Sequence, residues 1–503
     1  MNQWQRLDAK VMLVGPVGAF KQFLLPALIA LIGVGTQQPK WLLLAAPLII
    51  VASIVIGVVP WFTTRFQVTD TQLVVTTGLV SKQRLTAPLD RIRSVDLEAT
   101  LLHRVLQLEK VQVGTGVDDT MIELNALSVS QAADLRRLLL SRRGTSAPDE
   151  APAATGTQSS VGEASEPSGA TAPVAEGTPV PAADLVTFSP TWARFAPFSL
   201  GRLAIALGGL GALFQFSSEI RIDLSDNDVW NRVASASLAL VLLGVFAIAL
   251  VLWTALSMVT YLIGWWQLRL FREDGNLRLT RGLFTTQSTT VEEARIRGVR
   301  LRETALLRTV DGAEIHALVT GLEDATYAVL PQAPRAVTHA VAVAILGDEE
   351  PVRVALVPHG PAALRRALLR NVVTAEVLLL PAVALPLWLE WGWWVPLAAA
   401  VALALFGLVL GRMEYRHLGH ALTTDHLVAG SGITARTRTA LQRTGIIGWV
   451  FSQNPFQRRR ALATLTATTA AGAEQVVIRD VPLALAVALA DRATPGMLAE
   501  FTA

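Results

Sequence analysis

The chain has 503 residues, of which 52% are hydrophobic, and its mean hydropathy is +0.44. This composition is too apolar for an ordinary soluble protein, so part of the chain is expected in lipid, and the length suggests several domains. The formal net charge is only +3 with scattered basic residues, which argues against a nucleic-acid partner, and the absence of cysteine excludes disulfides, thiolate metal sites and a cysteine nucleophile.

Six apolar segments come as three pairs, and each approaches the roughly 20 residues that a helix needs to cross the hydrocarbon core of a bilayer. They are 17–34 with 41–62, 197–216 with 233–253, and 372–388 with 393–410. Tryptophans lie near many segment ends, as in an interfacial aromatic belt. We therefore expect six transmembrane helices, arranged as three hairpins, in a multi-pass protein of the cell membrane.

Lysine and arginine are unevenly distributed around these segments. Most of those that flank the segments lie on the side from which the hairpins leave and to which they return, whereas the hairpin loops hold only Lys40, Arg221 and Arg232. Cytoplasmic flanks of transmembrane helices carry this excess of positive charge. The regions between the hairpins and both termini are therefore expected in the cytoplasm.

A block of sequence recurs after each apolar pair. Gly78-Leu79 is followed by Arg91-Ile92-Arg93-Ser94-Val95, and Gly282-Leu283 is followed after the same gap by Arg295-Ile296-Arg297-Gly298-Val299. A more diverged third copy keeps Gly432-Ile433 and Arg443. Repeated words at a fixed spacing predict three structural repeats.

The first repeat has the pattern of a small antiparallel β-barrel or sandwich closed by a helix. Strands are predicted over 72–76, 79–86, 91–97, 110–114 and 121–124, and Gly78 supplies the first turn. Ser128 and Gln131 form a capping-box pattern that opens a helix to about Ser141. In the later copies Pro334 and Asp480-Val481-Pro482 precede similar helices, with Asp as a possible N-cap and Pro in the first turn.

Residues 144–181 are dominated by Ala, Pro, Gly, Ser, Thr and Glu, a composition that cannot bury enough apolar surface to fold. We expect a disordered linker here. The predicted organisation is hairpin 1 at 1–64, repeat 1 at 65–142, the linker at 143–190, hairpin 2 at 191–265, repeat 2 at 266–347, an amphipathic segment with hairpin 3 at 348–411, and repeat 3 at 412–495.

Val68-Thr69-Asp70, Gly78-Leu79 and Pro88-Leu89-Asp90-Arg91-Ile92, with the closing helix, resemble the bacterial PH-like domain of YdbS/YdbT-type membrane proteins. The segment Asn454 to Leu465 resembles the last domain of the YdbT type, which has three such repeats. The resemblance implies membrane-tethered PH-like modules with no established catalytic residue. It also implies a companion membrane protein of the YdbS type.

Two pairs of cations are candidate ligands for anionic headgroups. Lys82 and Arg84 follow the turn glycine of repeat 1 at the distance at which Arg436 and Arg438 follow that of repeat 3. Cations at positions i and i+2 of a strand project from one face, which suits contact with anionic phospholipids. The alternative is a pair of solvated edge-strand charges that deter aggregation.

A third candidate is the loop from Asn454 to Arg460, in which Phe456 stands beside Arg458, Arg459 and Arg460. An apolar side chain next to three cations could enter the membrane interface or meet a partner. A simple exposed loop is the alternative.

The repeated sequence motifs are interpreted as structural, because their arginines can pair with neighbouring acids such as Asp90, Glu292 and Glu293. The motif positions are Gly78, Arg91, Ile92, Gly282, Arg295, Ile296, Gly432 and Arg443.

No set of residues indicates catalysis. Glu414, His417 and His420 are spaced i, i+3 and i+6, which only loosely resembles half of a metal site, and an interfacial structural role is favoured. No nucleophile elbow, phosphate-binding loop or dinucleotide fingerprint is present in a suitable context. We therefore expect a protein that is not an enzyme and that has no cofactor or metal.

The sequence favours a membrane scaffold whose three cytoplasmic PH-like modules bind anionic lipid headgroups, peptides or protein partners, in envelope stress or antimicrobial resistance. The alternative is a component of a transporter or exporter, which would need polar groups in mid-membrane, and the predicted spans contain one acid, Glu376, near an end. A membrane enzyme is a third and weaker reading.

Overall fold

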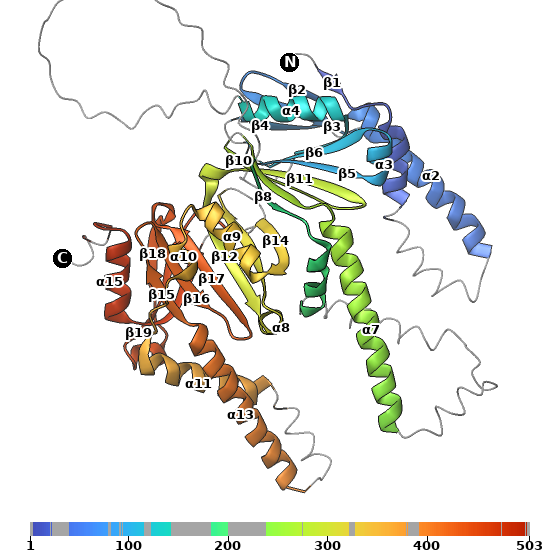
Figure 1. Ribbon diagram of the computed structural model, residues 1–503. Helices are drawn as coiled ribbons and strands as arrows, with labels where there is room; N and C mark the ends of the chain where they lie inside the picture. The colour runs from blue at the N-terminus through green and yellow to red at the C-terminus, as the bar shows by residue number, and fades with distance from the viewer. Residues whose placement is uncertain are drawn as a thin grey trace, which may run out of the picture. The chain divides into compact units, whose positions relative to one another are not determined.

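The computed structural model describes residues 4–499 except 21, 23–39, 79–81, 90–91, 93, 115–121, 142–182, 200–237, 274, 321–326, 379, 381–391, 474 and 498 (Figure 1). The chain forms two compact units. The first comprises 1–183 with 271–277, and the second comprises 184–270 with 278–503.

The first repeat is two antiparallel sheets with a closing helix, as predicted. One sheet has the order β1 (Gln5–Arg6), β2 (Arg65–Val68), β3 (Gln72–Thr77) and β4 (Gln83–Pro88); the other contains β5 (Ser94–Thr100), β6 (Leu108–Gly114) and β7 (Ile122–Ser128). Leu73, Val75, Ile92 and Val111 are buried in the core between them.

Helix α4 (Val129–Ser141) closes the first repeat, and its capping box is confirmed. The amide of Gln131 donates to Ser128 Oγ at 3.2 Å, and the amide of Ser128 donates to Gln131 Oε1 at 3.2 Å. Leu135 and Leu139 lie on one face of the helix and join the core. The predicted apolar stripe therefore fixes where the helix packs.

Each repeat also contains a one-turn helix that was not predicted from the sequence. These helices are α3 (Leu101–Val105), α8 (Ala305–Thr309) and α14 (Pro455–Arg458). Their N-caps are Thr100, Thr304 and Asn454, whose side chains accept a hydrogen bond from the third helical residue. A four- or five-residue helix has too little periodicity to be recognised in a sequence.

The second repeat begins earlier than predicted. Its strands and helices are β8 (Ala183–Thr187), η3 (Pro190–Phe198), β9 (Arg269–Glu273), β10 (Asn276–Arg281), β11 (Thr285–Glu292), η4 (Glu293–Arg295), β12 (Ile296–Thr304), α8, β13 (Gly312–Val319), β14 (Tyr327–Pro334) and α9 (Arg335–Leu346).

Two predicted boundaries are corrected by this arrangement. The linker expected to reach residue 190 ends before β8, because Asp184 in β8 pairs with Arg269 at 3.0 Å. The start of the third apolar segment is corrected too, since Pro197 lies in η3 beside the buried Phe195.

The third repeat has the same plan. Its elements are β15 (Gly419–Leu422), β16 (His426–Ser431), β17 (Ala435–Gln442), η5 (Arg443–Gly445), β18 (Gly448–Ser452), α14, β19 (Leu462–Thr468), β20 (Gln475–Pro482) and α15 (Leu483–Ala493). Leu427, Leu441, Leu465 and Ile478 are buried in its core. Asp480, predicted as a helix N-cap, is instead a buried residue two positions before the cap, which is Pro482.

Repeats 2 and 3 are joined by one continuous sheet, which the sequence did not predict. Strand β12 of repeat 2 pairs antiparallel with β17 of repeat 3, giving the strand order β14-β13-β12-β17-β16-β15. Gly298 makes this approach possible, because a Cβ atom there would lie 2.1 Å from the carbonyl oxygen of Ala440. The two repeats therefore share one β-sheet (Figure 1).

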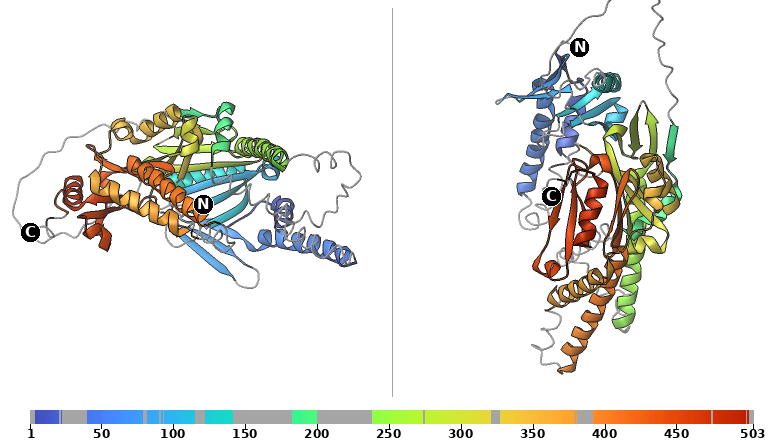
Figure 2. Two further views of the ribbon diagram at one scale, coloured as in Figure 1. Left: turned by 90° about the horizontal axis from the view of Figure 1, so that it is seen from below. Right: turned by 90° about the vertical axis from the view of Figure 1, so that its left-hand side faces the viewer.

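Long helices leave the sheets. They are α2 (Lys40–Thr63), α7 (Leu238–Trp265), α11 (Gly360–Leu378) and α13 (Trp394–His417). Helices α11 and α13 run side by side (Figures 1 and 2). The short helix α10 (Glu350–Arg353) precedes α11. In α13, Gly407 and Gly411 let the backbone of α11 approach, since a Cβ atom at either would lie within 2.7 Å of it.

Within the described residues, two helices are long and apolar enough to cross a membrane, Phe246–Trp265 and Trp394–His417. Few of their side chains are buried by protein, and Phe246, Val251, Leu405 and Phe406 are more than half exposed. Much of the other predicted segments, including residues 23–34 and 381–388, lies outside the described residues. The total of six transmembrane helices stays a prediction.

Candidate functional site: a cationic groove where two repeats meet

The sheet that joins repeats 2 and 3 carries polar side chains in rows across its strands. Alternate residues of a strand share a face, and directly opposed residues of paired strands lie next to one another. On one face the rows are His316, Arg300 and Thr439 in the first, and Glu314, Arg302 and Thr437 in the second. Arg300 Nε donates to Thr439 Oγ1 at 3.4 Å across the junction. The pairing of the two repeats therefore creates a surface that neither repeat has alone.

This face forms the floor of a groove of about 510 Å³, whose opposite wall comes from β20. Three arginines, Arg300, Arg302 and Arg479, line it together with His316, and Ser431, Thr437 and Thr439 add hydroxyl groups. None of the described residues that line the groove is acidic. Guanidinium and hydroxyl groups converging on one space are the donors that proteins use for phosphate. We name this space the junction groove.

Glu314 lies beside the groove and offsets one of its positive charges. Burial alone would raise the pKa of Glu314, but hydrogen bonds from His316 and Gln332 hold that pKa below its ordinary value. Gln332 Nε2 donates to Glu314 Oε1 at 2.8 Å. Burial also lowers the pKa of Arg300 from its ordinary value, which still leaves it a cation at neutral pH. With Arg300, Arg302 and Arg479 charged, the groove keeps an excess of positive charge.

One end of the groove adjoins the end of helix α13. His417, the last residue of α13, contacts the carbonyl oxygen of Gly432 through Nδ1 at 3.0 Å, and Gly432 lines the groove. Because the carbonyl can only accept, Nδ1 carries the proton and Nε2 accepts from Arg308 of α8 at 2.7 Å. The helix end is thus fixed to both repeats next to the groove.

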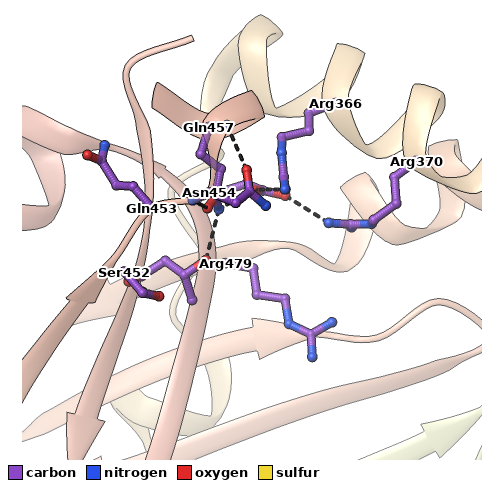
Figure 3. Close-up of a pocket in the computed structure, with 9 residues that line it drawn as sticks. Arg366, Arg370, Ser452, Gln453, Asn454, Gln457 and Arg479 are labelled. Atoms are coloured by element: carbon purple, nitrogen blue, oxygen red, sulfur yellow. Dashed lines mark hydrogen bonds and ion pairs between the residues drawn. The ribbon is translucent and has the colours of Figure 1, made fainter. Parts of the chain in front are cut away.

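A second polar pocket, of about 440 Å³, lies between α11 and the third repeat (Figure 3). Its centre is Asp480, which is fully buried and accepts hydrogen bonds from Gln457 at 2.8 Å, from Arg370 at 3.2 Å and from Arg366. In Figure 3 the Arg479 side chain points away from this cluster. The carboxylate of Asp480 is saturated by the protein, so this pocket is interpreted as a structural junction between helix and sheet.

The same network continues between helices α11 and α13. Arg370 also donates to Glu414 of α13, and Asn371 Nδ2 donates to the other oxygen of Glu414 at 2.7 Å. Glu414 is 4% exposed, so both its oxygens need these partners. The network joins α11, α13 and β20 into one body.

The histidines do not converge on a metal site. His420 Nδ1 lies 3.0 Å from His359 Nε2, whereas His417 and Glu414 have the separate partners described above. The described residues contain no group of three metal-ligating side chains. Burial, and then the proximity of His420, lowers the pKa of His359 to about 4, so His359 is neutral at physiological pH. Both histidines are buried.

The cation pairs predicted as headgroup ligands lie in two different settings. Lys82 and Arg84 are exposed, with Arg84 on β4. Arg438 on β17 instead donates to the carbonyl oxygens of Pro351, at 3.0 Å, and Val354. Burial, and then the charge of Arg436, lowers the pKa of Arg438 to about 10.

Arg436 lies opposite Glu303 in the register of β12 and β17. Both Arg436 and Arg438 alternate with the groove residues Thr437 and Thr439, so they lie on the other face of the sheet. Phe456, Arg458, Arg459 and Arg460 are exposed around α14. The structure therefore does not bring the seven predicted ligand residues together.

The motif residues hold the turns and ends of each repeat. The turn glycines Gly78, Gly282 and Gly432 have φ of 106°, 112° and 113°, a region that glycine alone adopts easily. Ile92 and Ile296 are buried, and Arg295 Nε donates to Glu292 at 2.7 Å. Arg91 lies outside the described residues.

Arg443 binds the end of the closing helix of repeat 3. Its guanidinium donates to the carbonyl oxygens of Arg492 at 2.9 Å, Ala493 at 2.8 Å and Thr424 at 2.7 Å. The last carbonyls of a helix lack partners within the helix, and a cation satisfies them well.

Sequence reasoning missed the groove residues Arg300, Arg302 and Arg479. A signal was present, because Arg300 and Arg302 are spaced i and i+2, like Lys82 and Arg84. The comparison of repeats drew attention to the shared Arg295 and Arg297 instead. The partner strand β17, which completes the groove, is separated from β12 by more than a hundred residues and could not be identified from spacing.

Comparison with known proteins gives the family. The family model described as Bacterial PH domain matches three regions, residues 16–143, 233–345 and 374–495, which together make up well over half of the chain. Each match covers most of one of the three sheet-and-helix repeats. Neither the curated proteins nor the solved structures contain a match. The chain belongs to the bacterial PH domain family and carries three copies of that domain.

Proposed function

We propose that the chain is a non-enzymatic scaffold of the cell membrane whose fused second and third PH domains bind the phosphate of an anionic lipid in the junction groove. The supporting observation is the convergence of Arg300, Arg302 and Arg479 at a groove with no acidic lining residue among those described. A phosphodiester offers two charged oxygens to such a cluster, and charge-assisted hydrogen bonds contribute about 1.5–3 kcal/mol each.

The position of the groove supports a lipid rather than a distant ligand. Its Gly432 end is held by His417, the last residue of a helix long and apolar enough to cross a bilayer. If α13 spans the membrane, the groove opens near the level of the headgroups. The positive-inside distribution of arginine and lysine puts this level on the cytoplasmic side, where anionic lipids attract cations.

The scaffold role rests on rigidity and on multiplicity. The continuous sheet fixes two PH domains relative to each other, and the Arg370, Glu414 and Asp480 network fixes them to the α11 and α13 pair. Several weak sites held at one surface bind more strongly together than alone. The exposed cations Lys82, Arg84, Arg458, Arg459 and Arg460 would add electrostatic attraction to the same membrane. A companion protein of the YdbS type and a role in envelope stress remain part of this proposal.

The prediction is that the double variant Arg300→Ala/Arg302→Ala loses lipid recognition. The full chain in detergent should be stabilised against thermal unfolding by phosphatidylglycerol and not by phosphatidylcholine, because a ligand that binds only the folded state raises the unfolding temperature. The variant should bind phosphatidylglycerol at least ~10-fold more weakly, since two charge-assisted contacts are lost.

The matched control is Arg137→Ala/Arg353→Ala, which removes two charges whose side chains are 77% and 75% exposed and do not line the groove. Inorganic phosphate is tested separately in the same thermal-unfolding experiment. Stabilisation by phosphate alone at similar concentrations would indicate that the groove binds a free anion instead of a lipid. Equal loss of phosphatidylglycerol binding in both double variants, or no lipid effect in the parent chain, would contradict the proposal.

A further inference from the structure

Strand β18 leaves one edge of the third repeat open. It is the outer strand of the sheet β18-β19-β20, and within the described residues no strand lies on its other side. Its neighbour Ile447 is 66% exposed and Val450 in its centre is 51% exposed. An exposed edge with apolar side chains is a template for pairing with another strand.

The second repeat contains the same strand in its paired state. Strands β12 and β18 both follow a three-residue 3-10 helix, η4 or η5, and both precede a one-turn helix. Strand β12 ends at the N-cap Thr304, and β18 ends at Ser452, two residues before the N-cap Asn454. On the side that is open in β18, β12 pairs with β17 over seven residues of each strand, from Gly298 opposite Leu441 to Thr304 opposite Ala435. The third repeat therefore has an unpaired strand edge at the position where the second repeat pairs with β17.

A glycine marks the same position in both strands. A Cβ atom at Gly298 would lie 2.1 Å from the carbonyl oxygen of Ala440, so the approach of β17 requires a glycine there. At the equivalent Gly448 the nearest atom to a Cβ would be Thr468 Oγ1 at 3.2 Å, and Gly448 is not among the glycines with positive φ. No backbone atom within the chain lies near a Cβ at 448, so a strand that approached Gly448 as β17 approaches Gly298 would meet no side chain there.

The first repeat has a strand edge that corresponds to the other side of this interface. Strand β4 is the counterpart of β17, because each follows a turn glycine, Gly78 or Gly432, and precedes the second sheet of its repeat. Strand β4 lies at the end of the sheet β1-β2-β3-β4, and β3 is its only strand neighbour in the described chain. Among the described strands, β18 and β4 thus each have an open edge, and these two edges correspond to the two sides of the β12 and β17 pairing.

We propose that β18 of one chain pairs antiparallel with β4 of a second copy, and that this pairing continues the sheet from molecule to molecule. Transfer of the β12 and β17 register places Gly448 opposite Ala87, Val450 opposite Leu85 and Ser452 opposite Gln83. Next along the strands, Lys82 would face the neutral Gln453, where the internal interface has Arg436 facing Glu303. The charges are compatible, and the contact is head-to-tail, so copies form a ring or an open row.

The natural absence of cysteine allows a direct test in native membranes. Chains carrying Val450→Cys and chains carrying Leu85→Cys are co-expressed and oxidised. Opposed residues of an antiparallel pair have Cβ atoms about 4.5–5.5 Å apart, which a disulfide can bridge with small adjustment. The control pair is Val450→Cys with Thr86→Cys, because Thr86 is one residue away and projects from the other face.

The expected result is a disulfide-linked dimer from the 450 and 85 pair and at least ~10-fold less from the 450 and 86 pair, as the faces of a strand alternate. Adding Gly448→Val to the Val450→Cys chain should abolish the dimer. Dimers formed by Val450→Cys alone would overturn the proposal in favour of β18 pairing with itself. A crosslink found only inside a chain that carries both substitutions, or no crosslink in any combination, would overturn it as well.

Discussion

Replacing Asp480 with alanine should open the third PH domain at β20 and detach it from α11. Asp480 is fully buried, and its carboxylate is the counter-charge for Arg366, whose side chain is only 13% exposed, and for Arg370. Removing one partner of a buried ion pair leaves the other charge uncompensated and costs about 3–5 kcal/mol. Asp480 also has φ of 54°, which a carboxamide or carboxylate side chain tolerates better than alanine.

The measurement is hydrogen exchange of the full chain in detergent, which reports the local free energy of opening. Amides of β19 and β20 should exchange at least ~100-fold faster in Asp480→Ala, as about 3 kcal/mol corresponds to that factor. Asp480→Asn keeps the shape and the tolerance of positive φ and removes the charge, so its effect should be smaller. Strands β5 to β7 of the first repeat serve as the internal reference. Unchanged exchange of β20 in the alanine variant would mean that the ion network does not stabilise this junction.

Replacing Gly298 with valine should separate the second and third PH domains. The new Cβ would lie 2.1 Å from the Ala440 carbonyl oxygen and 3.0 Å from Leu441 Cα, and backbone atoms cannot move away as a flexible side chain can. Overpacking usually costs about 1–3 kcal/mol, and a clash with a paired backbone belongs at the upper end of that range. The hydrogen bonds between β12 and β17 should be lost first.

Amides of β17 should then exchange faster, while Gly448→Val, the same change at the equivalent open position, leaves them as slow as in the parent chain. The Gly298→Val chain should also lose its stabilisation by phosphatidylglycerol although Arg300 and Arg302 remain, because Thr437 and Thr439 no longer face them. Retained slow exchange in β17 would contradict the requirement for glycine. Retained lipid stabilisation would show that the groove does not depend on the junction.

The local features of the fold, its turns, helix caps and strand order, were predictable because they depend on residues that are close in the sequence. The turn at Gly78, the reciprocal cap of Ser128 and Gln131 and the order of strands in a repeat follow from φ preferences, short side-chain reach and alternation. The repeat itself predicted that the same domain would appear three times, as the family match bears out.

The groove and the ion network were not predictable in the same way. Asp480 has the sequence context of a helix cap, and its burial is decided by Arg366 and Arg370, more than a hundred residues away. Arg436 and Arg438 were matched to Lys82 and Arg84 by position, but β17 has a strand partner that fixes which face meets the groove. Pairing between sheet edges of different repeats leaves no local pattern, so only the structure reveals it.

The central claim is that these PH domains lie on the cytoplasmic surface of the membrane, held by apolar helix pairs. Its most direct test is labelling of single cysteines, in an otherwise cysteine-free chain, with a membrane-impermeant thiol reagent. Arg459→Cys, at an exposed position in the third repeat, should react only after the cells are permeabilised, whereas Trp393→Cys, exposed at the other end of α13, should react in intact cells. Reaction of Arg459→Cys in intact cells, or release of the unlabelled chain from membranes by alkaline carbonate, would contradict the account.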